Sequence, residues 1–147
     1  KILNLDRLTA RRGQSGEGST EFVVRQEEAL RNEISIMSQL DHPHIARLQE
    51  VYEDDENIYL VQEVCSGGEL FDFLDEQPDY YMNEGDALRC VWQILSALRY
   101  LHSKGVVHRD LKLENFLFCT TKHLQLKMIG TFCRFGNSCT IYSRCSI

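Results

Sequence analysis

The sequence predicts an α+β fold in which short strands and one helix come first and a mainly helical part follows. Two segments, residues 21–40 and 83–103, carry apolar side chains at helical spacing. Two short apolar runs, residues 46–52 and 58–64, flank a polar turn, which is the pattern of an antiparallel strand pair. At about 150 residues per domain, the 147 residues amount to one domain or part of one.

Composition argues against several classes of protein. The net charge of −6 argues against a general nucleic-acid binder and against a surface attracted to anionic lipid. No apolar run reaches the ~18 residues of a membrane span, and residues 1–12 show no secretory leader. The six cysteines include no C-x₂-C pair, which favours free thiols over a zinc site. We therefore expect a cytoplasmic protein that contacts neither membrane nor nucleic acid.

The first elements are a strand, a loop and a helix. Residues 1–5 alternate loosely, as in a short strand, and residues 10–20 are rich in Gly, Ser and charge. Thr20 is the expected cap of the helix over residues 21–40. Its apolar stripe consists of Ala29, Leu30, Ile34, Met37 and Leu40. Glu33 lies on this stripe, so its carboxylate either has a partner or reaches solvent at the edge, and spacing does not decide between them.

Turn residues then separate the strands from the second long helix. Pro43 ends the first helix, and residues 54–57 turn the chain between the two strands. Residues 66–68 end the second strand, and a short helix over residues 69–74 follows. Two further apolar runs, at 116–119 and 124–129, come near the end.

The helix over residues 83–103 has a broad apolar face, so we expect it to be largely buried. That face consists of Leu88, Val91, Trp92, Leu95, Leu98, Tyr100 and Leu101. Gly105 suits the left-handed position that stops a helix. If nothing covers part of this face, the exposed apolar area favours association or aggregation.

The residues with the clearest chemistry lie between this helix and the next apolar run. Asp110, Lys112 and Asn115 fall within six positions of a polar loop. They offer a proton acceptor, a cation for a developing anion, and a hard oxygen ligand for Mg²⁺, which suits phosphoryl transfer. A chance mixture of charges in a solvated loop is the alternative, and composition alone does not exclude it.

The sequence of this loop resembles the catalytic loop of the protein kinases, H-R-D-L-x-x-x-N. The match covers every fixed position: His108, Arg109, Asp110, Leu111 and Asn115. Lys112 matches the lysine of the Ser/Thr kinases. Two further segments also resemble kinases: EISIMSQLDHPHI and YLVQEVCSGGELFDFL. Their sequences are most similar to those of the calcium/calmodulin-dependent and calcium-dependent protein kinases. The resemblance covers residues 1–129.

The resemblance implies an ATP site and its residues. Lys1 would hold the α- and β-phosphates and pair with Glu33, although residues 10–20 make their spacing longer than usual. Gln62 would be the gatekeeper, and Glu63 and Cys65 would offer backbone groups to adenine.

Four other residues complete the implied site. Leu117 would lie beneath the adenine ring. Glu69 would meet the ribose or a basic substrate residue, and Glu114 would face a basic substrate residue. Asp110 would orient the substrate hydroxyl, with Lys112 beside it, and Asn115 would bind Mg²⁺.

The pattern breaks after residue 129. Kinases continue here with D-F-G, whose Asp holds Mg²⁺, whereas this chain has Gly130 and Thr131. The internal apolar column of kinases is matched by Met37, Leu48 and His108, and its fourth member should be the missing Phe. Residues 130–147 show no kinase pattern and read as out-of-frame, intron-derived or alternative sequence. The glycine-rich phosphate loop and the activation segment also have no counterpart.

The sequence therefore predicts an incomplete two-lobed kinase fold. Residues 1–63 would form part of the small lobe, residues 64–129 the hinge and the start of the large lobe, and residues 130–147 a tail unlike kinases. The implied activity is transfer of the ATP γ-phosphate to Ser or Thr of a protein with basic residues nearby, using ATP and Mg²⁺. The alternative is an inactive kinase-derived fragment that acts as a binding module or is a truncated gene product. The oligomeric state is left open.

Overall fold

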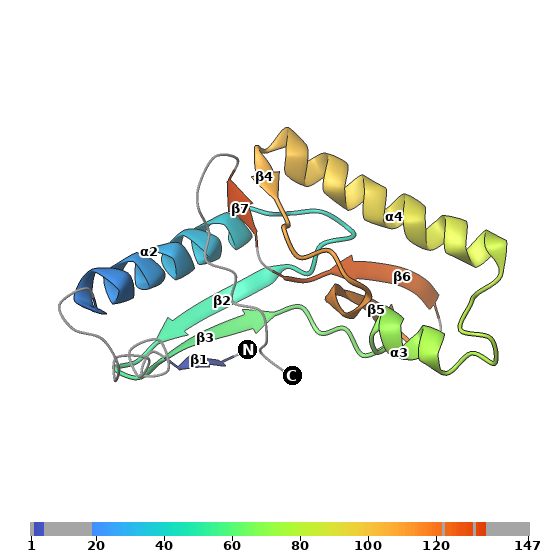
Figure 1. Cartoon of the computed structure of the whole chain (residues 1–147), viewed down its shortest axis with the longest axis horizontal. Helices are drawn as coiled ribbons and strands as arrows, with labels where there is room; N and C mark the ends of the chain where they lie inside the picture. Colours follow the sequence, from blue (N-terminus) through green and yellow to red (C-terminus); the bar gives the residue numbers. More distant parts are fainter. Residues whose placement is uncertain (1, 5–18, 122, 131, 135–147) are drawn as a thin grey trace.

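The computed structural model describes residues 2–4, 19–121, 123–130 and 132–134, and Figure 1 shows their arrangement. Helix α2 lies beside a small sheet, and helix α4 lies at the other side of the molecule beside a hairpin. The elements are β1 (Ile2–Asn4), α2 (Ser19–Met37), β2 (Leu48–Glu53), β3 (Asn57–Gln62), α3 (Leu70–Asp75), α4 (Glu84–Ser103), β4 (Val106–Val107), the 3₁₀ turn η2 (Leu113–Asn115), β5 (Phe116–Thr120), β6 (His123–Met128) and β7 (Cys133–Arg134).

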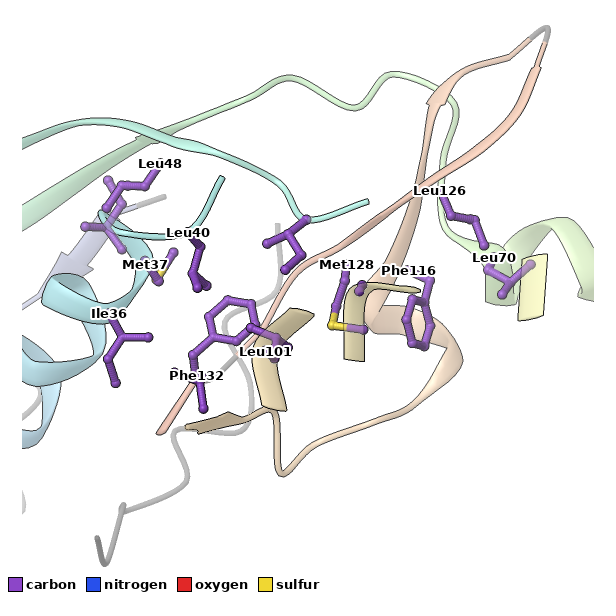
Figure 2. Packing of buried hydrophobic residues seen from close by; sticks show 14 of the residues in the cluster. Ile36, Met37, Leu40, Leu48, Leu70, Leu101, Phe116, Leu126, Met128 and Phe132 are labelled. Atoms are coloured by element: carbon purple, nitrogen blue, oxygen red, sulfur yellow. The ribbon is translucent and has the colours of Figure 1, made fainter. Parts of the chain in front are cut away.

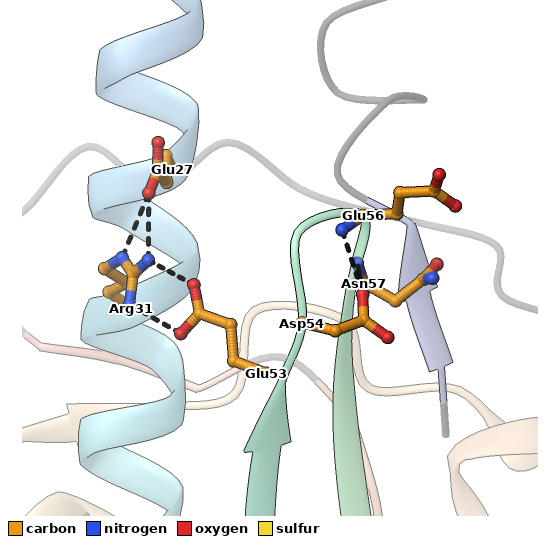
Figure 3. A network of polar contacts seen from close by, with 6 residues as sticks. All are labelled: Glu27, Arg31, Glu53, Asp54, Glu56 and Asn57. Atoms are coloured by element: carbon orange, nitrogen blue, oxygen red, sulfur yellow. Dashed lines mark hydrogen bonds and ion pairs between the residues drawn. The ribbon is translucent and has the colours of Figure 1, made fainter.

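The small sheet is antiparallel with strand order β1-β3-β2, so the predicted strand pair is confirmed and gains β1 at its edge. The polar turn forms because Asp54 accepts hydrogen bonds from the backbone N–H groups of Glu56 and Asn57 at 2.9 and 2.8 Å (Figure 3). In β3, Ile58 and Leu60 are buried, which follows from the alternation of side chains along a strand.

The predicted apolar stripe is buried at Leu30 and Met37 of α2 and at Leu40 just after the helix, each at most 6% exposed. Across its exposed side, Arg31 joins Glu27 at 3.0 Å and Glu53 of β2 at 2.6 Å (Figure 3). These ion pairs are open to solvent and screened, so they orient the helix against β2 more than they stabilise the fold.

The limits of α2 differ from the prediction at both ends. The helix already includes Ser19, so the prediction that Thr20 caps it was wrong. Its last turn tightens to 3₁₀ geometry, because the N–H groups of Gln39 and Leu40 bond to carbonyl groups three residues earlier. The α-helix therefore ends at Met37 instead of residue 40.

Helix α4 begins where the side chain of Asn83 accepts a hydrogen bond from the N–H of Asp86 at 3.0 Å, a standard N-cap. It ends before Gly105, whose φ of 70° confirms the predicted left-handed stop. Only one side is buried, mainly through Cys90, Ala97 and Leu101. The prediction of a largely buried helix was wrong on the other side, where four large apolar side chains are exposed: Leu88, Val91, Trp92 and Leu95.

One core joins the two halves of the molecule (Figure 2). The hairpin of β5 and β6 packs its apolar side chains against α4 and α3. Phe116 and Met128 come from this hairpin, Leu101 from α4, and Met37 and Leu48 from the small-sheet half. A continuous core of this kind fixes the hairpin and the loop before it relative to the small sheet.

The segment that follows β6 also belongs to the core. Phe132 and Cys133 are 2% and 1% exposed, and β7 pairs with β4 in antiparallel register. Cys65, Cys90 and Cys119 are free thiols, as predicted, whereas Cys133 is disulfide-bonded, which the prediction did not include. The lobe limits at residues 63 and 129 stay predictions.

No helix in the described part of the chain is both long and apolar enough to cross a bilayer.

Candidate functional site

The three residues predicted to carry the chemistry lie together in the segment that runs from the end of β4 to the last residue of η2. Asn115 donates from Nδ2 to the backbone oxygen of Asp110 at 2.7 Å and to its carboxylate Oδ2 at 3.1 Å. The Nζ of Lys112 lies 3.5 Å from the same Oδ2. The carboxylate, the amide and the ammonium group therefore share one small region, as the spacing in the sequence predicted.

The backbone of this loop is held in an uncommon conformation. Arg109 has a φ of 62°, in the left-handed region that non-glycine residues seldom adopt. His108 supports the turn from beneath, because its Nδ1 accepts the N–H of Asp110 at 3.3 Å and its Nε2 donates to the carbonyl of Ile129 at 2.8 Å. His108 is 2% exposed, and this burial lowers its pKa, so the ring is neutral when it makes both bonds.

The hinge segment, residues 63–69, crosses from the small sheet to the hairpin. Its start is fixed because Glu63 donates its N–H to the carbonyl of Arg47 at 2.8 Å and pairs its carboxylate with Lys127 at 2.9 Å. Lys127 is 8% exposed, so this charge is buried only because it is paired. Ser66 then donates its N–H to the carbonyl of Cys119 at 3.2 Å, which places the hinge segment along β5.

The two backbone groups predicted to bind adenine are available for hydrogen bonds. Within the described residues, the carbonyl of Glu63 and the N–H of Cys65 make no hydrogen bond, so both remain available to a ligand. Glu69 pairs with Leu117 in an isolated antiparallel bridge, so the end of the hinge segment lies beside β5, at a residue two positions after Asn115 in the chain. The adenine-binding and catalytic groups predicted from sequence therefore border the same strand.

The thiol of Cys65 is half-buried at the hinge segment. Burial raises its pKa to about 11, and the neighbouring thiol of Cys119 adds to the effect. At neutral pH this side chain is an uncharged, weakly nucleophilic group beside the place where an adenine ring would bind.

Three of the remaining predicted residues lie in the described part of the chain. Gln62 is the last residue of β3 and is half-buried where the hinge segment begins. Glu33 is half-buried on α2, and Glu114 is exposed in η2. Lys1 lies outside the described residues, so its pairing with Glu33 stays a prediction.

Gly130 stands where a metal-holding carboxylate would be expected. Its φ is 137°, and a Cβ added there would lie 2.6 Å from both Cε1 and Nε2 of His108. The same Cβ would be 3.6 Å from Nδ2 of Asn115, so this position faces the site. The local packing around His108 thus requires a residue without a side chain.

The donor groups present do not make a complete magnesium site. Mg²⁺ requires near-octahedral coordination, usually with one or two protein carboxylates. Asn115 offers its Oδ1 and Asp110 its carboxylate, but Gly130 offers nothing. Among the residues that the structure describes, no group of three or more His, Cys, Asp or Glu side chains is placed to hold a metal.

Phe132 is a residue of this site that the sequence did not predict. Its ring meets the ring of His108 edge to face, with centroids 5.3 Å apart (its packing is drawn in Figure 2). It belongs to the same core cluster as Met37 and Leu48, and its contact with His108 is the one that the missing Phe of D-F-G was expected to make. The feature of the sequence that could have identified Phe132 is the presence of an aromatic residue two positions after Gly130.

The chain matches the protein kinase domain family over residues 18–146. Calcium-dependent protein kinase 5 of Plasmodium berghei is 52% identical over 91 residues, which are 62% of this chain and 16% of that protein. Calcium/calmodulin-dependent protein kinase type 1 of Macrobrachium nipponense is 45% identical over 106 residues, which are 72% of this chain and 30% of that protein. The predicted resemblance to these two groups of kinases is confirmed.

A solved structure supports the fold. The crystal structure of Rad53 residues 1–466 in complex with AMP-PNP superposes with a TM-score of 0.64 and 36% identity, over 70% of this chain and 27% of that one. The prediction of an incomplete two-lobed kinase fold is therefore confirmed. The chain spans less than a third of the length of either curated relative described above. The chain belongs to the protein kinase domain family.

Proposed function

We propose that this chain carries the nucleotide-binding hinge and the catalytic loop of an ATP-dependent protein serine/threonine kinase. The observation that carries the proposal is the cluster of Asp110, Lys112 and Asn115, joined at 2.7–3.5 Å and bordering the same strand as the hinge segment. The relatives described above are named as a calcium-dependent and a calcium/calmodulin-dependent protein kinase, and the Rad53 structure is a complex with AMP-PNP, which supports ATP as the nucleotide.

Each group has a defined task in the transfer. The carbonyl of Glu63 and the N–H of Cys65 bind the adenine edge, with Leu117 beneath the ring. The hydroxyl oxygen of a Ser or Thr attacks the γ-phosphorus, the bond to the β,γ-bridging oxygen breaks, and ADP leaves. Asp110 orients the hydroxyl and accepts its proton, and the ammonium group of Lys112 neutralises charge on the transferred phosphoryl group.

The substrate is proposed from the acidic residues around the loop. Glu69 lies at the start of α3, with no hydrogen bond from its side chain to the helix end, and Glu114 is exposed in η2. α3 packs against η2, so both carboxylates border the site. They favour a protein segment with basic residues near the target Ser or Thr. A cytoplasmic location stays a prediction from composition.

A second function is favoured by Gly130. Bound metal ions neutralise much of the charge that develops during phosphoryl transfer, and this position supplies no ligand for them. A nucleotide-binding module that does not transfer phosphate is therefore the alternative. In that case the hinge segment binds adenine and the cluster around Asp110 contacts phosphate without turnover.

Labelled-phosphate transfer to a Ser-containing peptide with flanking Arg residues tests the proposal. The chain should label the peptide, and Asp110→Asn should lower the rate about 10²–10⁴-fold, the usual contribution of a positioned base. The matched control is Asp41→Asn, because Asp41 is an exposed carboxylate outside the 108–115 loop. If the chain binds nucleotide but does not label the peptide, the alternative function of a nucleotide-binding module is favoured. If the Asp110→Asn variant labels the peptide as fast as the unchanged chain, the role assigned to Asp110 is contradicted.

A further inference from the structure

Two thiols lie next to each other where the hinge segment meets β5. The N–H of Ser66, the residue after Cys65, donates to the carbonyl of Cys119 at 3.2 Å, and the Ser66 hydroxyl donates to the same oxygen at 3.4 Å. The next hinge residue, Gly67, donates its N–H to the carbonyl of Phe118 at 3.0 Å. These hydrogen bonds hold the backbones of Cys65 and Cys119 side by side.

The two thiol groups are themselves in contact. Cys65 and Cys119 share a side-chain hydrogen bond, and both are half-buried free thiols. A disulfide requires Cα atoms about 4.4–6.8 Å apart and side chains that point toward each other. Adjacent backbones with thiols in contact are the arrangement from which such a bond forms. The other free thiol in the described part of the chain is Cys90 of α4, which is 3% exposed.

The two neighbouring thiols differ in how easily they ionise. Burial raises the pKa of both, and the neighbouring Cys119 adds to the effect at Cys65, where the pKa reaches about 11. At Cys119, the ammonium group of Lys127 and the hydrogen bond with Cys65 offset part of this rise. Cys119 therefore ionises first, and the thiolate is the form that attacks a disulfide.

We propose that Cys65 and Cys119 form a reversible disulfide, with a small-molecule disulfide such as oxidised glutathione as the oxidant, and that this bond weakens nucleotide binding at the hinge segment. The Cys119 thiolate attacks one sulfur of oxidised glutathione, the S–S bond breaks, and one glutathione thiolate leaves. Cys65 then loses its proton to water and attacks the Cys119 sulfur, which releases the second glutathione. Two protein thiols are oxidised, and one glutathione disulfide is reduced to two thiols.

The effect on nucleotide binding rests on the proposed function. Closing the disulfide brings the two sulfur atoms to about 2.0 Å and draws Cys65 toward β5. The N–H of Cys65 is the proposed donor to adenine, and it moves with the residue. Loss of one such hydrogen bond weakens binding about 2–10-fold.

Peptide mapping without reduction tests the disulfide on the intact chain. Trypsin cuts after Arg and Lys, and it separates the three free thiols named above into residues 48–89, 90–99 and 113–122. After treatment with oxidised glutathione, the monomeric band of a gel should contain residues 48–89 linked to residues 113–122, and dithiothreitol should separate them. Residues 90–99 are the internal control and should keep a free thiol, because Cys90 is buried.

Two serine variants test the pairing and the order of attack. Cys65→Ser should stop with glutathione attached to Cys119, and the linked peptide should be lost. Cys119→Ser should also lose the linked peptide and should react more slowly, because Cys65 is protonated at neutral pH. Glutathione on both cysteines of the unchanged chain without a link between them, or a link from either to another cysteine, would overturn the proposal.

Thermal melting at increasing ATP concentration, on the reduced and the oxidised chain, measures the consequence. The apparent Kd for ATP should rise about 2–10-fold on oxidation and return to its first value after dithiothreitol. An equal Kd in both forms, with the linked peptide present, would overturn the effect on binding. If ATP binds neither form while the link still appears, the proposed function fails and the disulfide stands, because peptide mapping reports it independently.

Discussion

At the scale of single residues, Gly130 accounts for two features of the site. No carboxylate is present at this position to bind a metal, and the loop supported by His108 keeps its conformation. The position faces Asn115, yet a Cβ there would overlap the ring of His108 at 2.6 Å. His108 in turn supports the backbone N–H of Asp110. The chain therefore keeps the loop that orients Asp110 in a conformation that excludes a carboxylate at residue 130.

Gly130→Ala should lower the free energy of unfolding by about 2–6 kcal/mol. A left-handed backbone strain of about 1–3 kcal/mol adds to a steric overlap with His108 that costs a similar amount. Urea denaturation measures the difference. Gly105→Ala is the control, because Gly105 also has a positive φ but has open space around its Cβ position, so it carries the strain alone. Equal losses for the two variants would show that the overlap is absent.

The thiol of Cys65 gives a second test at this scale. Because its pKa is raised to about 11, mainly by burial, the alkylation rate at Cys65 should rise about tenfold per pH unit between pH 8 and 10. Peptide mapping after brief iodoacetamide treatment reports this rate separately for Cys65. A free cysteine under the same conditions levels off near its ordinary pKa. A plateau at Cys65 below pH 9 would contradict the burial of this group at the hinge segment.

At the scale of elements, the loop that holds Asp110 depends on the segment after β6. β7 pairs with β4, and Phe132 packs against His108 and the core. The segment lacks the D-F-G motif, yet it places an aromatic ring against His108, where that motif was expected to supply its phenylalanine. Phe132, two residues after Gly130, provides this ring.

Phe132→Ala should therefore cost about 3–5 kcal/mol of stability, the usual loss for truncating a buried phenylalanine. It should also release the ring of His108, so the histidine ring protons should shift in NMR spectra. Phe71→Ala is the matched control, because Phe71 is 45% exposed on α3 and its loss should change the stability little. If both variants unfold at the same denaturant concentration, Phe132 is not a core residue.

The sequence predicted most elements but not all of their limits or burial. Hydrophobic patterning located α2, α4, the strands β1, β2 and β3, and the apolar runs that form β5 and β6, because burial leaves such patterns in the sequence. It placed the start and end of α2 wrongly, since local 3₁₀ geometry leaves no such pattern. It also predicted a buried α4, because periodicity reports that Leu88 and Trp92 are apolar, not whether anything covers them.

At the scale of the whole molecule, the site combines segments that lie far apart in sequence. The motif at Asp110, Lys112 and Asn115 was readable because these residues are close in the chain. The bridge between Glu69 and Leu117, and the ion pair between Glu63 and Lys127, depend on tertiary packing and were not predicted as contacts. The roles implied for Glu33, Gln62 and Glu114 stay predictions, and Lys1 lies outside the described residues.

The central claim is that the hinge segment and the 108–115 loop form a nucleotide site whose magnesium-binding part is incomplete. Thermal melting with ATP, in excess Mg²⁺ and separately in EDTA, tests this most directly. At ATP one hundredfold above Kd we predict a stabilisation of about 2.7 kcal/mol in both conditions, because the hinge contacts need no metal. No shift at millimolar ATP would contradict the nucleotide site, and a shift seen only with Mg²⁺ would contradict the incomplete metal site.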